Sequence, residues 1–250
     1  GFETLLAILR TYLFAHTAQP DSKALGYSIY YTLVNLGGAI GPNLATNVRR
    51  SLGIEYVLLC SALTTALLFV GTWLFFKEPK RQDGEGEARS LGQVLRDLLT
   101  VLRNQRFLLF LLIFSGFWVM FWQIFLSLTF YIKDVLHFDA YERLTSVDAW
   151  AIIALQVGVT AATRKLRPIL AMSAGFAVSS ASWLLLTLGS SPWLVVAALI
   201  VFAIGETMQA PRYYEYVASL APKNQVGTYM GFAFLPVAIG AYLGGPLATF

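Results

Sequence analysis

Long stretches without a charged residue are the feature that most constrains how this chain can fold. Four such stretches contain no Asp, Glu, Lys or Arg. They are residues 25–46, 56–76, 107–132 and 224–250. A helix needs about 20 mostly apolar residues to cross the hydrocarbon core of a bilayer. We therefore expect each stretch to form a membrane-spanning helix.

Further stretches complete the predicted set of helices. Residues 168–205 are uncharged but too long for one span, and the turn signal Gly189-Ser190-Ser191-Pro192 divides them into two helices. Residues 149–163 are a shorter apolar stretch, which we expect to be extended by residues just before Asp148. Residues 1–17 are expected to be the remainder of a truncated helix. The chain is thus predicted to be an all-α membrane protein with about eight transmembrane helices, cut at both ends.

Composition agrees with a membrane environment. Hydrophobic residues make up 57% of the chain and charged residues 13%, whereas soluble domains carry about 25% charged residues. The net charge is +4, but the basic residues lie in short connectors beside apolar stretches, as in membrane proteins. We therefore expect membrane lipids, and no nucleic acid, as partners. The single cysteine, Cys60, allows no intramolecular disulfide.

The connectors predict an orientation, because cytoplasmic connectors are enriched in Lys and Arg. One alternating set of connectors contains twelve basic residues: Lys23, Lys77, Lys80, Arg81, Arg89, Arg96, Arg103, Arg106, Arg164, Lys165, Arg167 and Lys223. The other set contains only Arg49, Arg50, Lys133 and Arg143. The first set is expected to face the cytoplasm.

The longest connector, residues 77–106, begins as a polar linker and then becomes amphipathic. From Ser90, a plausible N-cap, leucine and valine residues recur at helical spacing: Leu91, Val94, Leu95, Leu98, Leu99 and Leu102. This helix is expected to lie at the cytoplasmic lipid headgroups or to pack on the other helices. The predicted organisation is the end of an N-terminal bundle at 1–76, this linker, and a C-terminal bundle at 107–250.

Glu206 is the most informative candidate for a functional residue. Ionisable side chains within a span cost ~2.5–3.5 kcal/mol on insertion scales. Glu206 lies ~20 Å along its helix from Trp193, close to the bilayer midplane. Pro211 cannot donate to the carbonyl of Thr207, which leaves a backbone acceptor nearby. Glu206 suits a proton or a substrate amine; the alternative is an ion pair with a basic residue on another helix.

Other polar residues in the apolar stretches could contribute to a substrate or proton site. Glu3 and Arg10 are seven residues apart on one predicted helix face, and Gln123, Asn35 and Tyr31 have polar tips that could fix a ligand or bridge helices. Arg212 and Glu215, three residues apart, could form an ion pair or a gate.

Enzyme motifs do not occur in the sequence. It contains no nucleophile elbow, phosphate loop or HExxH motif, and His16 and His137 have no second metal ligand at a suitable spacing. We expect no catalytic residues, no metal and no cofactor, and therefore not an enzyme.

Three segments resemble helices of one transporter family. GETMQAP at 205–211, followed by LAP at 220–222, resembles the tenth helix of the proton-dependent oligopeptide transporters of the major facilitator superfamily. YYTLVNLG at 30–37 is similar to that family's fifth helix, and FWVMFWQ at 117–123 to its seventh. The resemblance implies that the chain is a partial bundle, helices four to eleven of twelve.

The resemblance implies a function as well. It implies a multi-pass protein of the bacterial inner membrane, a proton-coupled secondary transporter of small, peptide-like solutes that works by alternating access. Trp122 stands where the family usually has a carboxylate, and Gly37-x-x-x-Gly41-Pro42 resembles a motif of drug–proton antiporters. A drug or metabolite antiporter is therefore the alternative. A membrane sensor or lipid-modifying enzyme is the alternative of a different class.

Overall fold

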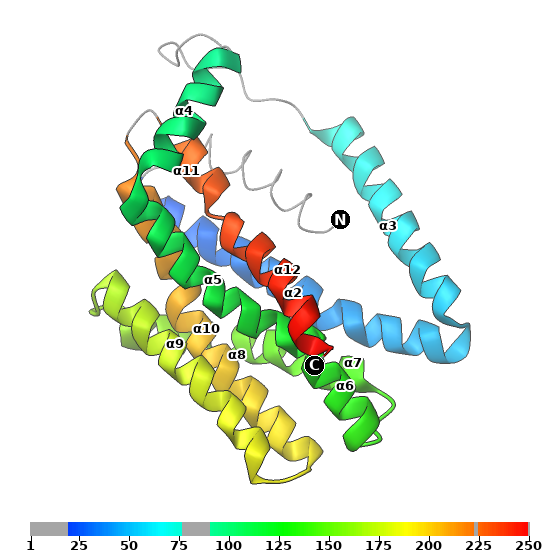
Figure 1. Ribbon diagram of the computed structural model, residues 1–250. Coiled ribbons are helices and arrows are strands. Elements are labelled where there is room, and N and C mark those ends of the chain that lie inside the picture. Colours follow the sequence, from blue (N-terminus) through cyan, green and yellow to red (C-terminus); the bar gives the residue numbers. More distant parts are fainter. Residues whose placement is uncertain (1–19, 77–90, 223–224, 250) are drawn as a thin grey trace. The chain divides into compact units, whose positions relative to one another are not determined.

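The computed structural model describes residues 20–76, 91–222 and 225–249, and within these ranges every regular element is a helix (Figure 1). The longer elements are α2 (Pro20–Ser51), α3 (Ile54–Phe75), α4 (Leu91–Arg103), α5 (Gln105–Phe125), α8 (Val147–Thr163), α9 (Pro168–Leu184), α10 (Pro192–Leu220) and α12 (Leu235–Ala248). The shorter ones are α6 (Ser127–Phe130), the π-helical turn η1 (Tyr131–Val135), α7 (Tyr141–Thr145), the 3₁₀ turn η2 (Leu185–Leu188) and α11 (Val226–Phe232).

Six helical segments of the described ranges are long and apolar enough to cross a membrane. They are Ile54–Phe75, Gln105–Val135, Tyr141–Thr163, Pro168–Leu188, Pro192–Leu220 and Val226–Ala248. α2, with 32 residues, is also long enough to cross a membrane. Its polar residues and glycines make it less apolar than these six segments. The prediction of an all-α membrane protein is therefore confirmed. The helix predicted at 1–17 lies outside the described residues.

Two predicted spans contain breaks that the sequence analysis did not foresee. The regular α-helix of the span at 107–132 is interrupted at Leu126, where φ is −107° and ψ is −90°, and the chain then continues as α6 and η1. The span at 224–250 is divided between Phe232 and Leu235. Pro236 lies in the first turn of α12. N–H groups in the first turn have no acceptor within the helix, so the missing N–H of proline costs no helical hydrogen bond there. The predicted short helix at 149–163 is longer, since α7 precedes α8 and together they form a 23-residue segment.

The chain divides into two compact units. The first consists of 1–85 together with 142–154, and the second of 86–141 together with 155–250. The division along the chain falls within the predicted linker at 77–106, but the beginning of α8 belongs to the unit that contains α2 and α3. α8 thus contributes residues to both units.

Within the second unit, small residues allow two helix pairs to pack closely. A Cβ atom added at Gly205 on α10 would lie 2.5 Å from the carbonyl oxygen of Gly175 on α9. One added at Gly240 on α12 would lie 2.6 Å from the carbonyl carbon of Trp118 on α5. These contacts bring the backbones of α9 and α10, and of α5 and α12, together.

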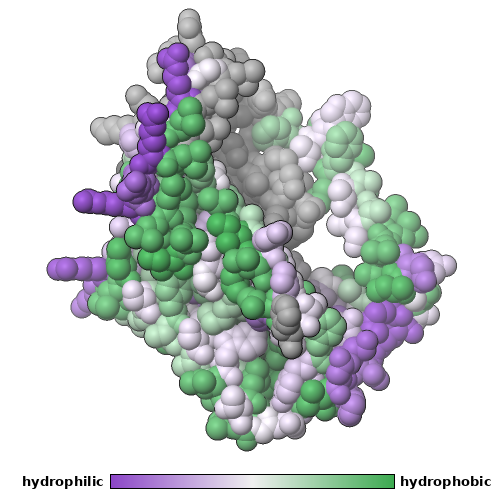
Figure 2. Space-filling model, viewed as in Figure 1, coloured by the Kyte–Doolittle hydropathy of each residue, from purple (hydrophilic) through white to green (hydrophobic). Residues whose placement is uncertain are grey.

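The surface of the described helices is strongly apolar. Figure 2 shows hydrophobic residues over much of the visible face, with hydrophilic residues gathered in a few places. In α3 no residue is buried, and Phe69, Trp73 and Phe75 are 73%, 76% and 83% exposed. Apolar surface of this extent requires lipid or protein contact, which agrees with helices that lie in a bilayer.

Candidate functional site

Glu206 lies deep inside α10. It follows the first residue of the helix, Pro192, by ~21 Å at 1.5 Å per residue, and the residue is 8% exposed. A ~30 Å hydrocarbon core places a residue at that depth nearer the midplane than either surface. An ionised carboxylate there requires a compensating partner, because charges are costly to remove from water.

Aromatic rings form the surroundings of this part of α10. On α5, Phe110, Phe114, Phe117 and Phe121 recur at helical spacing, so they share one face. The ring of Phe114 stacks on Tyr213 of α10 with centroids 3.9 Å apart, and Phe117 stacks on Phe202 of α10 at 5.8 Å.

Glu206 belongs to the same face of α10 as these aromatic residues. Phe202 precedes it by four residues and Tyr213 follows it by seven, which are spacings of one helical face. Phe176 of α9 also joins this layer, with its ring 5.1 Å from that of Phe114. Aromatic faces attract cations, so a carboxylate within this layer favours a cationic group over an anionic one.

The backbone beside Glu206 is held rigidly by α9. Gly205 approaches Gly175 and Ser179 so closely that no side chain fits at position 205. Ser179 also donates a hydrogen bond from Oγ to the carbonyl oxygen of Phe202 at 3.3 Å. The position of the carboxylate is therefore determined by the packing of α9 on α10.

Two further polar residues near Glu206 were missed by the sequence analysis. Gln209 is fully buried and Thr207 is 1% exposed. Within the described residues, neither the Gln209 amide nor the Thr207 Oγ has a hydrogen-bond partner. Buried polar groups normally have one, so these atoms remain available to a water molecule or a solute. Their position in an apolar helix was the signal that could have identified them.

Gln123, a predicted ligand-binding residue, is engaged between helices. Its Nε2 donates to the carbonyl oxygens of Val119 and of Gly244 on α12, each at 3.2 Å, and its Oε1 accepts from Ser127. The neighbouring Trp122 donates from Nε1 to the carbonyl oxygen of Val237 at 3.3 Å. Both side chains therefore join α5 to α12 in this structure.

Arg212 and Glu215 form an ion pair with 2.9 Å between Nη1 and Oε2. The same guanidinium donates from Nη2 to the carbonyl oxygens of Thr163 at 3.5 Å and Arg164 at 3.1 Å, at the C-terminal end of α8. A cation at a helix C-terminus is favourable because the terminal carbonyls carry partial negative charge. The arginine therefore joins α10 to α8.

The other predicted site residues lie elsewhere in the chain. Asn35 is half-buried on α2, and Tyr31 lies on the same helix. Glu3 and Arg10 lie outside the described residues. Asn35 and Tyr31 belong to the first unit, whereas Glu206 and Gln123 belong to the second.

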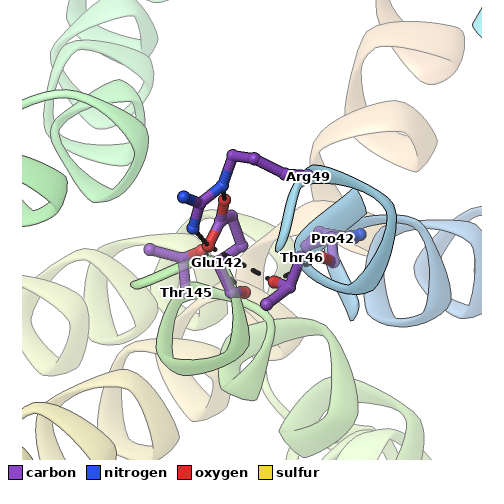
Figure 3. A network of polar contacts seen from close by, with 5 residues as sticks. All are labelled: Pro42, Thr46, Arg49, Glu142 and Thr145. Atoms are coloured by element: carbon purple, nitrogen blue, oxygen red, sulfur yellow. Dashed lines mark hydrogen bonds and ion pairs between the residues drawn. The ribbon is translucent and has the colours of Figure 1, made fainter. Parts of the chain in front are cut away.

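A polar network that the sequence analysis did not predict joins α2 to α7 (Figure 3). Arg49 donates from Nε to Oε1 of Glu142 at 2.6 Å and from Nη2 to Oε2 at 3.0 Å. Thr46 Oγ1 lies 3.3 Å from the same Oε2 and 2.9 Å from the carbonyl oxygen of Pro42. A bidentate arginine–carboxylate pair fixes orientation as well as distance.

Additional contacts extend this network along both helices. Asn43 donates to Ser146 Oγ at 2.9 Å, and Arg143 donates to Asn47 Oδ1 at 2.8 Å. The sequence analysis interpreted Arg49 and Arg143 only as connector charges. The spacing of Thr46 and Arg49, three residues apart after Pro42, was the available signal for a polar face.

Comparisons with known proteins agree with this architecture. A family model described as Major Facilitator Superfamily matches residues 1–245. The chain is 27% identical over 256 residues to dipeptide and tripeptide permease B of Edwardsiella piscicida, covering 92% of this chain and 48% of the permease. It is 26% identical over 255 residues to the multidrug resistance protein MdtH of Klebsiella pneumoniae, covering 96% and 59%.

A third relative is an uncharacterized MFS-type transporter, YttB, of Bacillus subtilis, with 24% identity over 253 residues covering 99% of this chain and 62% of the relative. The chain therefore spans about half the length of the curated relatives it matches, 48% to 62%.

Proposed function

Because this chain belongs to the Major Facilitator Superfamily, we propose that it serves in the secondary transport of small solutes, driven by protons, across a bacterial inner membrane. It is an integral membrane protein with multiple spans. In such transporters two helical bundles rock around a site near the bilayer midplane. The observation that carries the proposal is that Glu206 is buried on the face of α10 whose aromatic residues, Phe202 and Tyr213, stack on rings of α5.

Glu206 is the group that we propose binds the proton or a cationic part of the solute. Its depth in α10 matches the midplane position of transporter sites. Pro211 follows five residues later inside the helix and has no N–H, so the carbonyl of Thr207 is available as an acceptor beside the carboxylate. A proton, or an ammonium group, could be shared between these acceptors.

Peptide-like solutes are the leading substrate class. A peptide offers an ammonium group that a carboxylate can bind, and amide groups that match donors and acceptors such as those of Gln209. The relatives named as dipeptide and tripeptide permeases support this class. Gln123, Asn35, Tyr31, Arg10 and Glu3 are the remaining residues that we propose contribute to the solute or proton route.

A drug or metabolite antiporter is the second candidate, supported by the aromatic layer itself. Rings at Phe114, Phe117, Phe176 and Phe202 offer an apolar and cation-attracting surface that does not require a peptide backbone. The relatives named MdtH are multidrug resistance proteins. A lipophilic organic cation fits this surface and one carboxylate.

The central test is Glu206→Gln in the complete protein, reconstituted in liposomes. Loss of the titratable group should reduce pH-driven solute accumulation by about tenfold or more, the factor that ~1.4 kcal/mol of coupling free energy represents, while exchange of solute without a gradient persists. Glu55→Gln, which changes an exposed carboxylate in the first turn of α3, is the matched control. Undiminished pH-driven accumulation by Glu206→Gln would exclude the proposed role.

Binding measurements on the purified protein separate the two substrate classes. For a peptide transporter, a dipeptide should bind and its N-acetylated form should bind much more weakly, because acetylation removes the cation. For a drug antiporter, a lipophilic cation such as a tetraaryl phosphonium should bind and neither peptide should.

A further inference from the structure

We propose that the side-chain amide of Gln209 binds the carboxyl group of Glu206 while that group carries its proton. Gln209 is then the residue that positions the proton-carrying group inside the membrane. The inference rests on the proposed transport function and adds a second residue to its proton site. Its support comes from the burial of Gln209, from the geometry of α10 and from the residues of the helices packed against α10.

The amide of Gln209 is buried and needs a partner of a particular kind. The residue is fully buried, and within the described residues neither its Oε1 nor its Nε2 makes a hydrogen bond. A buried polar group without a partner is costly. An amide has an acceptor oxygen and a donor nitrogen, so its partner must both donate and accept. A carboxyl group that carries a proton does both, whereas an ionised carboxylate only accepts.

Helix geometry directs this amide toward Glu206. Gln209 follows Glu206 by three residues, which is ~60° around the helix axis and ~4.5 Å along it, and residues at this spacing are neighbours on a helix surface. Long side chains in a helix point back toward its N-terminus, over the residues three and four positions earlier. Those residues are Glu206 and Gly205, and Gly205 has no side chain. Glu206 is therefore the side chain of α10 that Gln209 can reach on this turn.

The described residues of α9 and α5 offer no competing polar side chain at this turn. A Cβ atom added at Gly175 of α9 would lie 3.1 Å from Cβ of Gln209, so α9 faces the amide side chain with a glycine. Ser179, one turn farther along α9, already donates to the carbonyl oxygen of Phe202 at 3.3 Å. On α5, the ring of Phe117 stacks on that of Phe202. The polar partner of the amide is therefore expected from α10 itself.

Titratable residues are few on the helices packed against α10 in the same unit. α9, η2 and residues 155–163 of α8 have none, and α5 and α11 have one each, Arg106 and Tyr229. After Glu206, α10 itself carries Arg212, Tyr213, Tyr214, Glu215 and Tyr216. Arg212 is bound to Glu215, and the hydroxyl of Tyr213 donates to the carbonyl oxygen of Ala233. All of these residues lie on other turns or other helices, so Gln209 is the polar neighbour that α10 places beside Glu206.

The amide and the protonated carboxyl group are complementary. The O–H of the acid donates to Oε1 of Gln209, and Nε2 of Gln209 donates to the other oxygen of the carboxyl group, so two hydrogen bonds form. The proton comes from water, binds one carboxylate oxygen and leaves from the same oxygen, while the amide only exchanges hydrogen bonds. When Glu206 is ionised, Oε1 loses its donor. Gln209 therefore distinguishes the two protonation states of Glu206.

Infrared difference spectra of the complete protein in lipid, recorded between neutral and acidic pH, test this contact. Glu206→Gln identifies the carbonyl band of the protonated acid, because it removes that band. Gln209→Met keeps the length of the side chain without its polar atoms, so the band should move to higher wavenumber as the acid loses its hydrogen bonds. Thr207→Val, which removes a buried hydroxyl ~100° around the helix from Glu206, is the matched control and should leave the band in place. An unmoved band in Gln209→Met would overturn the inference.

Transport separates this role from a contact between Gln209 and the solute. Gln209→Met should lower pH-driven accumulation about fivefold, which corresponds to the ~1 kcal/mol of one neutral hydrogen bond, while the KM for the solute stays unchanged. A higher KM with an unmoved band would assign the amide to the solute and contradict the inference. Melting temperatures show whether Gln209→Met is folded, and Gln209→Leu is the second variant if it is not.

The inference and the proposed function fail in different ways. If acidification produces no band that Glu206→Gln removes, Glu206 binds no proton, and its role in the proposed function is wrong together with the inference. If the band is present but does not respond to Gln209→Met or Gln209→Leu, only the inference is wrong, and the proton role of Glu206 stands.

Discussion

At the scale of single residues, the carboxylates of Glu142 and Glu206 have contrasting surroundings. Glu142 is bound by the guanidinium of Arg49 and the hydroxyl of Thr46. Glu206 lies on a helix face between Phe202 and Tyr213 and is only 8% exposed. A bidentate arginine fixes the orientation of the Glu142 carboxylate, whereas the aromatic rings on the face of α10 that carries Glu206 attract cations, which is what the proposed role of Glu206 requires.

Tyr213 provides a prediction about the aromatic layer. Its hydroxyl donates to the carbonyl oxygen of Ala233 at 2.7 Å, where the chain passes from α11 to α12, and the residue is 1% exposed. Tyr213→Phe should lower the free energy of unfolding by ~1–3 kcal/mol, because the carbonyl at this break then lacks a donor. Thermal unfolding in detergent measures the change.

The control for this prediction is Tyr216→Phe on the same helix. The ring of Tyr216 contacts Phe110 at 5.0 Å, but its hydroxyl makes no hydrogen bond among the described residues. A similar loss of stability in both variants would show that the hydroxyl of Tyr213 contributes nothing through Ala233.

At the scale of helices, glycine determines which pairs pack closely. Gly240 and Gly244 of α12 contact Trp118 and Trp122 of α5. Other glycines at the same four-residue spacing, Gly41, Gly227 and Gly231, would have no atom within 4 Å of an added Cβ. The small-xxx-small pattern therefore indicates a face that permits close packing, and tertiary structure decides whether a partner uses it.

Gly240→Ala tests the contribution of this contact between α5 and α12. A methyl group at position 240 would meet the backbone of Trp118, which cannot move aside as a flexible side chain can. Stability should fall by ~1–3 kcal/mol, as in other overpacked sites. Gly245→Ala on the same helix is the matched control, since nothing lies within 4 Å of that position. Equal melting temperatures for the two variants would contradict the close contact.

At the scale of the whole molecule, the bilayer accounts for features that water does not. The apolar helix α3, in which no residue is buried, and the apolar surface of the other described helices require a lipid or protein environment. The unequal charge of alternate connectors, twelve basic residues against four, predicts how the spans are oriented in it.

Cysteine labelling in intact cells tests this orientation. In a background with Cys60→Ser, a cysteine replacing Gly86 in the connector 77–106 should not react with a membrane-impermeant maleimide, because the connector is expected to be cytoplasmic. A cysteine replacing Ser51, which lies beside Arg49 and Arg50 at the end of α2, should react. The reverse pattern would invert the topology.

The positions of the spans, and the presence of a carboxylate, Glu206, within one of them, could be predicted from the sequence alone. Insertion into a bilayer depends on apolarity summed over about 20 consecutive residues, which is a local property. A charged residue within such a stretch is conspicuous for the same reason. The predicted stretches from 25 onward accordingly coincide with described helices.

The tertiary structure alone decided which side chains meet. Arg49 and Glu142 are 93 residues apart, Gln123 binds Gly244 across 121 residues, and the breaks at Leu126 and before Leu235 interrupt uniformly apolar sequence. Hydropathy contains no information on how a helix is rotated or where along its length a neighbour crosses it. Those quantities follow from shape and hydrogen bonding between helices, and they determined the aromatic contacts between α5 and α10 and the polar network between α2 and α7.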